Sequence, residues 1–445
     1  MEKKAVYITL GCKLNFAETS SLGDKLEAAG VGRAAHGEHA DVCVVNTCTV
    51  TETSSHKCRQ AINRAVRENP DALMVVMGCY AQMAADEIAA MPGVDLVIDM
   101  EHKGRAAEMI IERLQESSGE SQESRVESQE AISESKGSMP FVPSCSRGER
   151  TRFFLKVQDG CDYFCTYCVI PFARGRSRNG SIADIVRQAE DAVLHGGKEI
   201  VITGVNIGDF GKSTGESFLE LIQELDKVEG VERYRISSIE PNLLTEEIID
   251  FCAQSRHFMP HFHIPLQSGS DEVLRLMHRR YDTELFASRV GYIKKVMPDC
   301  FIGVDIIVGT RGETDELFEK SYDFAKSIDV SQFHVFSYSE RPGTAALRIP
   351  YKVANQVKHE RSQRLIALSE EKRKSFYARY IGQVRPVLTE RNHTGLAAKG
   401  FTDNYIHVEV DTAVNAQLDN AVVNYRLTGF NADKTALLGE EDKRR

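Results

Sequence analysis

The sequence lacks three features that would each place it in a different class of protein. No apolar run approaches the ~18 residues of a membrane-spanning helix, so no membrane partner is expected. The first ten residues lack the small-residue cleavage site of a signal peptide, and they are expected to form a strand in a cytoplasmic protein. The sequence also lacks an excess of positive charge: it has 55 Lys and Arg and 65 Asp and Glu, which gives a net charge of −10. Bulk charge therefore gives no support to nucleic-acid binding, although a local basic face is not excluded.

What is present is typical of a soluble globular protein. The chain has 445 residues, enough for two to four domains, with 42% hydrophobic and 27% charged residues. Its eleven cysteines are more naturally metal ligands or buried thiols than disulfides in a reducing compartment.

Three of these cysteines lie in one short loop. Cys161, Cys165 and Cys168 have the spacing C-x3-C-x2-C, with a glycine before them and aromatic residues between them. Three thiolates on one loop can hold three irons of a [4Fe–4S] cluster and leave the fourth iron open to a small molecule. Reductive cleavage of S-adenosylmethionine needs such an open iron. A zinc site would normally recruit a fourth Cys or His, and none follows closely; chance clustering is the remaining alternative.

The chain's periodicity predicts three structured regions of α/β and β class. Residues 1–114 alternate short apolar strands with helices, which predicts a doubly wound parallel sheet. Residues 115–140 are rich in Ser, Glu and Gln and are expected to be a flexible linker. Residues 147–377 contain six strand–helix units, which suit a partial TIM-like (β/α)6 barrel with its chemistry at the C-terminal face. Residues 380–442 predict a small antiparallel β-barrel.

Three further cysteines follow three different predicted strands of the N-terminal region. Cys12, Cys48 and Cys79 each come one or two residues after a strand, and the C-terminal ends of parallel strands share one edge of a sheet. Gly11 and Gly78 allow close backbone approach at two of these positions. The pattern favours a second three-cysteine cluster over three incidental buried thiols.

The other cysteines have no ligand-like neighbours. Cys43 is expected in the core and Cys58 at the surface of a helix. Core or loop positions are expected for Cys145, Cys252 and Cys300.

Several separated motifs, in order, resemble those of the radical-SAM methylthiotransferases along nearly the whole chain. They are Gly11-Cys-Lys-Leu-Asn15, Asn46-Thr-Cys48, Gly78-Cys-Tyr-Ala-Gln82, the 158–168 run with Pro171 and Arg174-Gly-Arg-Ser-Arg178, Ile202-Thr-Gly-Val-Asn206, 235–241, 263–270, Gly303-Val-Asp305 and 338–344. The resemblance implies the same three-domain order, ending in an RNA-binding TRAM barrel. It also implies a sulfur-transferring enzyme with two [4Fe–4S] clusters and S-adenosylmethionine.

Within that family, the residues around Cys12 and Cys48 look like the branch that acts on N6-threonylcarbamoyladenosine beside the tRNA anticodon. Thr9-Leu-Gly-Cys-Lys13 and Thr49-Val-Thr51 carry this similarity. One segment departs from the family: Thr310 and Arg311 stand where Phe-Pro is usual. Arg311 there is expected either to contact an anion or to be a solvated charge, with the second favoured.

The resemblance implies which residues serve which cofactor. The first cluster, on Cys161, Cys165 and Cys168, would bind S-adenosylmethionine and yield a radical that removes hydrogen from C2 of the adenine. The second, on Cys12, Cys48 and Cys79, would hold the sulfur, and a second adenosylmethionine would supply the methyl group. Gly204, Ser238, Glu240 and Gln267 lie at or after barrel strands and are expected to bind adenosylmethionine, with turn or cap roles as the alternative. No catalytic histidine or carboxylate pair is predicted, and His261 and His263 are interpreted as packing or hydrogen-bonding residues and not as metal ligands.

Contacts to tRNA are expected from local basic patches. The candidates are Arg174, Arg176, Arg178, Arg279 and Arg280 near the cluster loop, and Arg385, Arg391, Lys399, Arg426, Phe401 and Tyr405 on the terminal barrel. Scattered solvated charge is the strong alternative for the barrel, because acidic residues there are as numerous. Other expected partners are an electron donor such as flavodoxin or ferredoxin and a sulfur source; the oligomeric state is open, with a monomer expected.

Two other functions stay open at this point. The enzyme could act on isopentenyladenosine in tRNA or on an aspartate of a small-subunit ribosomal protein. A different class would be an RNA-binding protein whose clusters are structural or redox-sensing, which the open-iron spacing disfavours.

Overall fold

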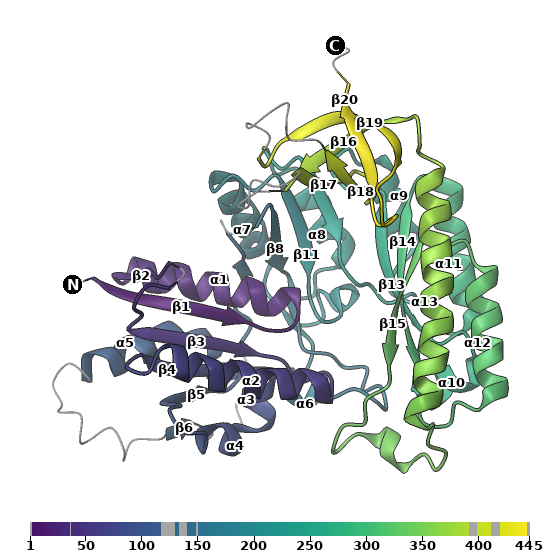
Figure 1. Ribbon diagram of the computed structural model, residues 1–445. Coiled ribbons are helices and arrows are strands. Elements are labelled where there is room, and N and C mark those ends of the chain that lie inside the picture. Colours follow the sequence, from purple (N-terminus) through teal and green to yellow (C-terminus); the bar gives the residue numbers. More distant parts are fainter. Residues whose placement is uncertain are drawn as a thin grey trace.

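A computed structural model describes residues 2–35, 37–116, 130–132, 140–147, 150–390, 398–410 and 419–442. Figure 1 shows three parts: an N-terminal sheet with helices on the left, a larger central α/β part, and a small barrel above it. No helix among these residues is both long enough and apolar enough to cross a membrane.

The N-terminal part is a parallel sheet in the order β2-β1-β3-β4-β5-β6. Its strands are β1 (Lys3–Thr9), β2 (Val31–Arg33), β3 (Val42–Thr47), β4 (Leu73–Gly78), β5 (Leu96–Ile98) and β6 (Glu130–Ile132). Its main helices are α1 (Lys13–Ala28), α2 (Glu52–Glu68), α3 (Cys79–Met83), α4 (Ala85–Ala89) and α5 (Ala106–Glu116), and η1 (His102–Arg105) precedes α5.

Helices cover both faces of this sheet, as the doubly wound pattern predicts. Successive residues of β3 point to opposite sides: Val42 and Val44 pack with α1 and α5, whereas Cys43 and Val45 pack with α2 and α4. Both faces are therefore buried, which explains the continuous apolar runs of β3 and β4.

The central part is a partial barrel of six parallel strands. Its strands are β8 (Arg152–Lys156), β11 (Glu199–Thr203), β12 (Arg233–Ile236), β13 (His261–Gln267), β14 (Phe301–Val308) and β15 (Gln332–Ser337), with β7 (Ser144–Cys145) added antiparallel at the β8 edge. A bridge from Ser238 to His263 connects the β12 side to β13. All six predicted strands of this region are confirmed within about two residues.

Helices follow these strands, and several begin at capping side chains. They are α6 (Ile170–Arg174), α7 (Ile182–Leu194), α8 (Phe218–Leu225), α9 (Glu246–Gln254), α10 (Asp271–Leu276), α11 (Thr283–Val296), α12 (Asp315–Ser327) and α13 (Asn355–Ala378). Ser217, for example, accepts a hydrogen bond from the Glu220 amide and its own amide donates to the Glu220 side chain, a complete capping box.

The terminal part is a closed barrel in the order β16-β17-β18-β20-β19. The strands are β16 (Val384–Thr389), β17 (Ala398–Thr402), β18 (His407–Val410), β19 (Val422–Phe430) and β20 (Leu437–Glu441). Four pairings are antiparallel, but β18 and β20 run parallel, so the expectation of a purely antiparallel barrel is corrected at that seam.

Among the described strands of three residues or more, β2, β6 and β17 are the ones that the sequence does not predict. The strand β6 lies inside the Ser/Glu-rich segment and pairs with β5. Its backbone can add to a sheet edge without the apolar side chains that periodicity detects. The rest of the expected linker, apart from residues 115, 116 and 140, lies outside the described residues.

Candidate active site

Each sulfur of the C-x3-C-x2-C loop accepts one N–H hydrogen bond. The amide of Tyr163 donates to Cys161 Sγ and the amide of Ile170 to Cys168 Sγ, both over 3.4 Å. The guanidinium Nη1 of Arg279 donates to Cys165 Sγ over 3.0 Å. Donors directed at sulfur stabilise negative charge there, as a cluster-bound thiolate requires.

The same three thiols are held in surroundings that disfavour the free thiolate. Burial raises the pKa of Cys161 to about 11 and of Cys168 to about 12, and it also raises the pKa of Cys165. Without a cation they stay protonated at neutral pH, so a bound iron centre would have to displace their protons. No group of three His, Cys, Asp or Glu among the described residues suits a single metal ion, whereas a polynuclear cluster needs more widely spaced thiols.

Arg279 is a buried partner of the cluster loop, so the expectation that it contacts tRNA is wrong. Besides Cys165, it pairs with Glu240 and donates to the Tyr281 hydroxyl, and its side chain is 3% exposed. Basic character alone could not reveal this burial. Arg280 is exposed, with its guanidinium 4.1 Å from the ring of Tyr163.

The structure brings together Cys12, Cys48 and Cys79. A Cβ on Gly11, which has φ +102°, would lie 2.7 Å from Cys48 Cβ and 3.1 Å from its sulfur, so only glycine allows this approach. Burial raises the pKa of Cys79, and the charges of Cys12 and Cys48 would raise it further. The three thiols thus share one electrostatic neighbourhood at the C-terminal edge of the sheet.

Cys58 also belongs to this neighbourhood, and the expectation of a surface thiol is wrong. It is fully buried, its sulfur accepts a hydrogen bond from the Cys48 amide over 3.2 Å, and its thiol donates to the Cys48 carbonyl over 3.3 Å. The helical position beside Lys57 and Arg59 suggested exposure, but Cys58 lies on the inner face of α2. Cys43, Cys145, Cys252 and Cys300 are buried, as expected.

Arg174 joins the two cysteine sets. It ends α6, which follows Cys168, and its Nε donates to Cys79 Sγ over 3.2 Å. Its other nitrogens donate to Asp159 Oδ1 over 2.9 Å and to Asn15 Oδ1 over 2.6 Å. The side chain is 1% exposed, so its expected contact with tRNA is wrong.

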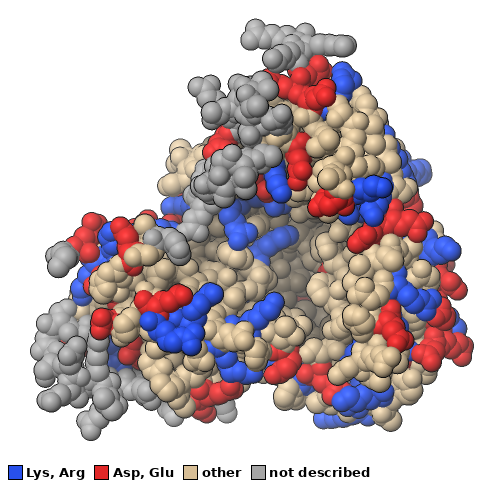
Figure 2. All heavy atoms as spheres, in the orientation of Figure 1, with Lys and Arg blue, Asp and Glu red and all other residues tan. Residues whose placement is uncertain are grey.

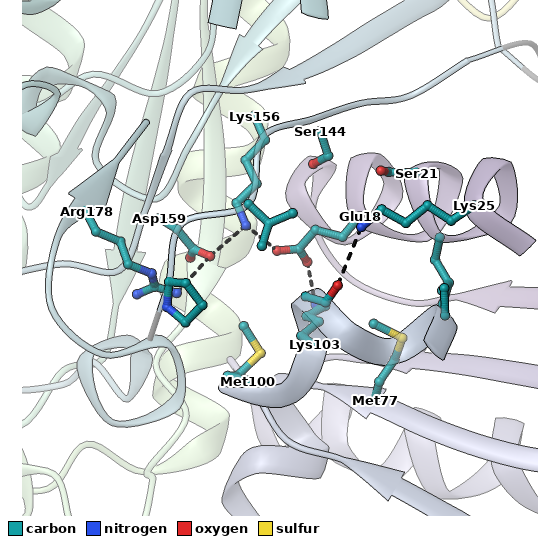
Figure 3. A pocket seen from close by; sticks show the side chains of 15 residues that line it. Glu18, Ser21, Lys25, Met77, Met100, Lys103, Ser144, Lys156, Asp159 and Arg178 are labelled. Carbon is teal, nitrogen blue, oxygen red and sulfur yellow. Dashed lines mark hydrogen bonds and ion pairs between the residues drawn. The ribbon is translucent and has the colours of Figure 1, made fainter. Parts of the chain in front are cut away.

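A buried network of charges surrounds Arg174. Figure 3 shows Lys156 between the carboxylates of Glu18 and Asp159, each 2.8 Å from its Nζ. Glu18 also contacts Lys103 and Arg174, and Asp159 contacts Arg178. Burial would raise the pKa of Glu18, but the charges of Arg174, Lys103 and Lys156 hold it well below its ordinary value. Four cations against two carboxylates leave an excess of positive charge beside Cys79, which suits an anionic thiolate cluster.

Arg178 is therefore an ion-pair residue of this network, with its side chain 13% exposed. Of the predicted tRNA-contacting arginines on this loop, Arg176 is the exposed one, at 77% of its side chain. It lies over Phe164, itself exposed.

A cavity of about 450 Å³ runs along the inner face of the barrel. Its walls come from the β1–α1 connection, from β8, β11, β12 and β13, and from the loop before β18; they include Cys12, Lys13, Gly204, Ser238 and Tyr405. Figure 2 shows the molecule hollowed between the N-terminal part, the terminal barrel and the β13–β15 side, with Lys and Arg side chains on its left and upper walls.

Of the residues expected to bind adenosylmethionine, Gly204 and Ser238 line this cavity and the other two do not. Glu240 faces Arg279 at the cluster loop, and Gln267 ends β13 with φ +64° at a register shift. Such a φ is unusual for a residue with a side chain and is often found at functional sites.

Polar atoms without partners lie at the C-terminal end of β11. Among the described residues, Thr203 Oγ1 and both side-chain polar atoms of Asn206 are buried with no hydrogen-bond partner. Gln158 holds this end in place: its Oε1 accepts from the amides of Val205 and Asn206, and its Nε2 donates to the Gly160 carbonyl. Buried groups left unpaired in a polar setting suit a bound polar ligand.

The two histidines have the packing and hydrogen-bonding roles expected of them. His263 Nε2 is 2.8 Å from Asp305 Oδ1, and its ring stacks on His334. His261 packs between Phe301 and Tyr405.

Arg311 is neither a free anion contact nor a solvated charge. It pairs with Glu340, with Nε 2.9 Å from Oε1, and donates to the carbonyl of Ile349 over 3.0 Å. Arg311, which departs from the family pattern, is therefore held by contacts with neighbouring residues of the same part of the chain.

The predicted RNA contacts of the terminal barrel are mostly neutralised by acidic neighbours. Arg385 pairs with Asp403 and Asp299, Lys399 with Glu409, and Arg426 with Asp442. Phe401 and Tyr405 stack on each other with ring centroids 4.8 Å apart. Arg391 lies outside the described residues.

Two family models match the chain. Residues 4–99 match the uncharacterized protein family UPF0004, and residues 155–325 match the radical SAM superfamily. Among curated proteins, the threonylcarbamoyladenosine tRNA methylthiotransferase MtaB of Bacillus subtilis is 41% identical over 406 residues, covering 90% of this chain and 88% of that protein. The tRNA-2-methylthio-N(6)-dimethylallyladenosine synthase of Fusobacterium nucleatum is 30% identical over 95% of this chain and 97% of that protein.

Among solved structures, the radical S-adenosylmethionine methyltransferase TsrM of Kitasatospora setae has a similar fold. The TM-score is 0.55 at 16% identity, over 78% of this chain and 77% of that one. This likeness concerns the fold alone.

Proposed function

The chain belongs to the tRNA methylthiotransferases of the radical SAM superfamily, and on that premise we propose that it converts N6-threonylcarbamoyladenosine in tRNA to its 2-methylthio derivative. The observation that carries the proposal is the near full-length similarity to threonylcarbamoyladenosine methylthiotransferases, at higher identity than to the dimethylallyladenosine synthase. The two three-cysteine sets connected through Arg174 support the methylthiolation chemistry, which the runner-up substrate would share.

The residues present fit two [4Fe–4S] clusters. Cys161, Cys165 and Cys168 would hold one and leave an open iron, since three thiolates serve four irons. A cluster held there would supply the one-electron reductive cleavage of S-adenosylmethionine, and with it removal of the hydrogen from C2 of the adenine. The amides of Tyr163 and Ile170 and the guanidinium of Arg279 would stabilise the ligating sulfurs.

Cys12, Cys48 and Cys79 would hold the second cluster, through which sulfur is delivered. The positive charge of Arg174 and its neighbours stabilises the thiolate of Cys79 in a site where water is excluded. Arg174 also holds Cys79 against the helix that follows the C-x3-C-x2-C loop, as a reaction that uses both cysteine sets requires.

Gly204 and Ser238 are proposed to bind adenosylmethionine from the cavity wall, together with Glu240 and Gln267. Gly204 and Ser238 both line the cavity, and Gly204 is also required by local packing, because a Cβ there would lie 2.6 Å from Ile207 and 3.0 Å from the Gln158 side chain. The unpaired Thr203 and Asn206 beside Gly204 are added to the set predicted from the sequence.

The proposed enzyme has three domains and a linker, and it needs partners for its chemistry. The domains are residues 1–114 for the second cluster, 115–140 as linker, 147–377 as the radical-SAM core and 380–442 as a TRAM-like RNA-binding unit. The partners are the tRNA anticodon stem-loop, a flavodoxin- or ferredoxin-type electron donor and a sulfur source. The protein is proposed to act in the cytoplasm as a monomer.

Mass spectrometry of tRNA nucleosides from cells with and without the gene tests the proposal. Loss of 2-methylthio-N6-threonylcarbamoyladenosine, with accumulation of its precursor, is the expected result. Loss of the isopentenyl counterpart instead would establish the runner-up substrate. Unchanged nucleosides would favour the ribosomal-protein substrate or an RNA-binding protein with structural clusters.

A further inference from the structure

The cavity along the barrel is basic, and two of its cations form no hydrogen bond or ion pair with a described residue. Lys13, Arg150, Arg152 and Arg235 line it, and no Asp or Glu is among its lining residues. Arg235 pairs with Glu199, and Arg152 contacts Glu390 and Tyr405. Lys13 and Arg150 make no hydrogen bond or ion pair with any residue in the described ranges, although Arg150 lies over the ring of Phe16.

Lys13 lines this cavity next to Cys12. It is the first residue of α1, directly after Cys12, and its side chain is exposed to the cavity rather than packed in the core. Asp305, on β14, is the carboxylate whose charge reaches the Lys13 ammonium. Asp305 is already hydrogen-bonded to His263. An ammonium in such a place is stabilised by an anionic ligand.

The proposed substrate offers an anion where Lys13 could meet it. The threonylcarbamoyl group on N6 ends in a carboxylate, whereas an isopentenyl group carries no charge. In adenine, C2 and C6 flank the same ring nitrogen, so a base whose C2 faces the cluster site at Cys12 also directs its N6 substituent toward that side of the cavity.

We propose that Lys13, with Arg150 beside the cavity mouth, forms a subsite for the carboxylate of the threonylcarbamoyl group and thereby selects this substrate over isopentenyladenosine. The inference rests on the function proposed above and adds the determinant of its substrate choice. A cation that lines the cavity without a partner gains from a paired anion, whereas an apolar substituent leaves it without one. This asymmetry rejects the neutral analogue more strongly than a hydrophobic pocket can.

The test separates the carboxylate from every other anion of the RNA. Two synthetic anticodon stem-loops carry, at the same adenosine, the N6-threonylcarbamoyl group or its neutral methyl ester. Their dissociation constants and their methylthiolation rates are measured with the cluster-loaded wild type, Lys13→Met, Lys13→Arg and Lys295→Met. Lys295 is an exposed lysine of α11 and serves as the matched control.

We expect the wild type to bind the acid about 10- to 100-fold more tightly than the ester, as for a hydrogen bond to a charged group. Lys13→Met should lose this preference with ester binding unchanged, Lys13→Arg should keep most of it, and Lys295→Met all of it. If Lys13→Met weakens the acid and the ester alike, Lys13 serves an RNA phosphate or the cofactor, and the inference is overturned. A third stem-loop, with isopentenyladenosine at the same position, distinguishes failure of the proposed function: the wild type would then methylthiolate this stem-loop and neither the acid nor the ester.

Discussion

Arg174 donates a hydrogen bond from Nε to the sulfur of Cys79 over 3.2 Å. The two residues belong to different parts of the chain: Cys79 begins α3 of the N-terminal sheet, and Arg174 ends the helix after the C-x3-C-x2-C loop. The same guanidinium contacts Glu18 of α1 and Asp159, just before Cys161. One side chain therefore fixes the geometry between the two proposed cluster sites.

Replacing Arg174 by Met should destabilise the protein strongly. The change leaves the buried carboxylates of Glu18 and Asp159 without one of their counter-charges, and breaking a buried pair typically costs about 3–5 kcal/mol of unfolding free energy. Chemical denaturation of the purified protein measures this. Arg176→Met is the control, because that side chain is 77% exposed and its loss should change stability by no more than about 0.5 kcal/mol. Equal stability of the two variants would contradict a structural role for Arg174.

The two cysteine sets should separate the two halves of the reaction. Cys161→Ala should abolish formation of 5′-deoxyadenosine from S-adenosylmethionine, because that chemistry depends on the first set. Cys79→Ala should retain this cleavage and lose methylthiolation of tRNA. Each variant should hold about half the iron of the wild type, measured by metal analysis after anaerobic reconstitution.

Cys252→Ala is the control for these variants, because Cys252 is a buried thiol of the barrel, away from both sets. It should keep the full iron content and both activities. If Cys79→Ala held as much iron as Cys252→Ala, the second cluster would not reside on Cys12, Cys48 and Cys79.

The stability of the cluster-free protein should fall at alkaline pH. Burial raises the pKa of Cys161 to about 11 and of Cys168 to about 12, above the ~8.5 of an unfolded thiol. Between these values the folded state holds more protons than the unfolded state, so the free energy of unfolding decreases as pH rises from about 8.5 toward 11–12. Urea unfolding at pH 8 and pH 10 measures the decrease, and a Cys161→Ala/Cys168→Ala variant should show a smaller one. An equal decrease in both proteins would assign the effect to other groups.

The regular strands could be predicted because they bury both faces or alternate clearly. All six parallel strands of the barrel and four of the N-terminal sheet, β1, β3, β4 and β5, follow from apolar runs with helical stretches between them. The short strands β2 and β6 could not, because a few residues at a sheet edge carry too little periodic signal. The strand β17 lies inside the closed barrel, but its five residues include Gly400 and show no clear apolar pattern.

The proximity of Cys12, Cys48 and Cys79 could also be predicted, since all three follow strands of one parallel sheet. The burial of a charged side chain could not be predicted from the sequence. Arg174 and Arg279 look like RNA contacts in a basic run, yet both are buried against cysteine sulfur. Their carboxylate partners lie far away in sequence, so only the folded chain reveals them.

Arg341 should couple the second cysteine set to the core. Its guanidinium donates to Thr49 Oγ1 over 2.7 Å and to Glu52 over 2.9 Å, directly after Cys48. Arg341→Met should loosen this contact and lower the rate of methylthiolation about tenfold, because a base must meet both sets at once. Formation of 5′-deoxyadenosine, which needs only the first set, should stay within about twofold of the wild type. Lys352→Met is the control, since exposed Lys352 pairs with Glu340 and does not contact the N-terminal part. A parallel loss of both activities in Arg341→Met would show that Arg341 supports the first set as well. Formation of 5′-deoxyadenosine would then not be independent of the contact between Arg341 and the N-terminal part.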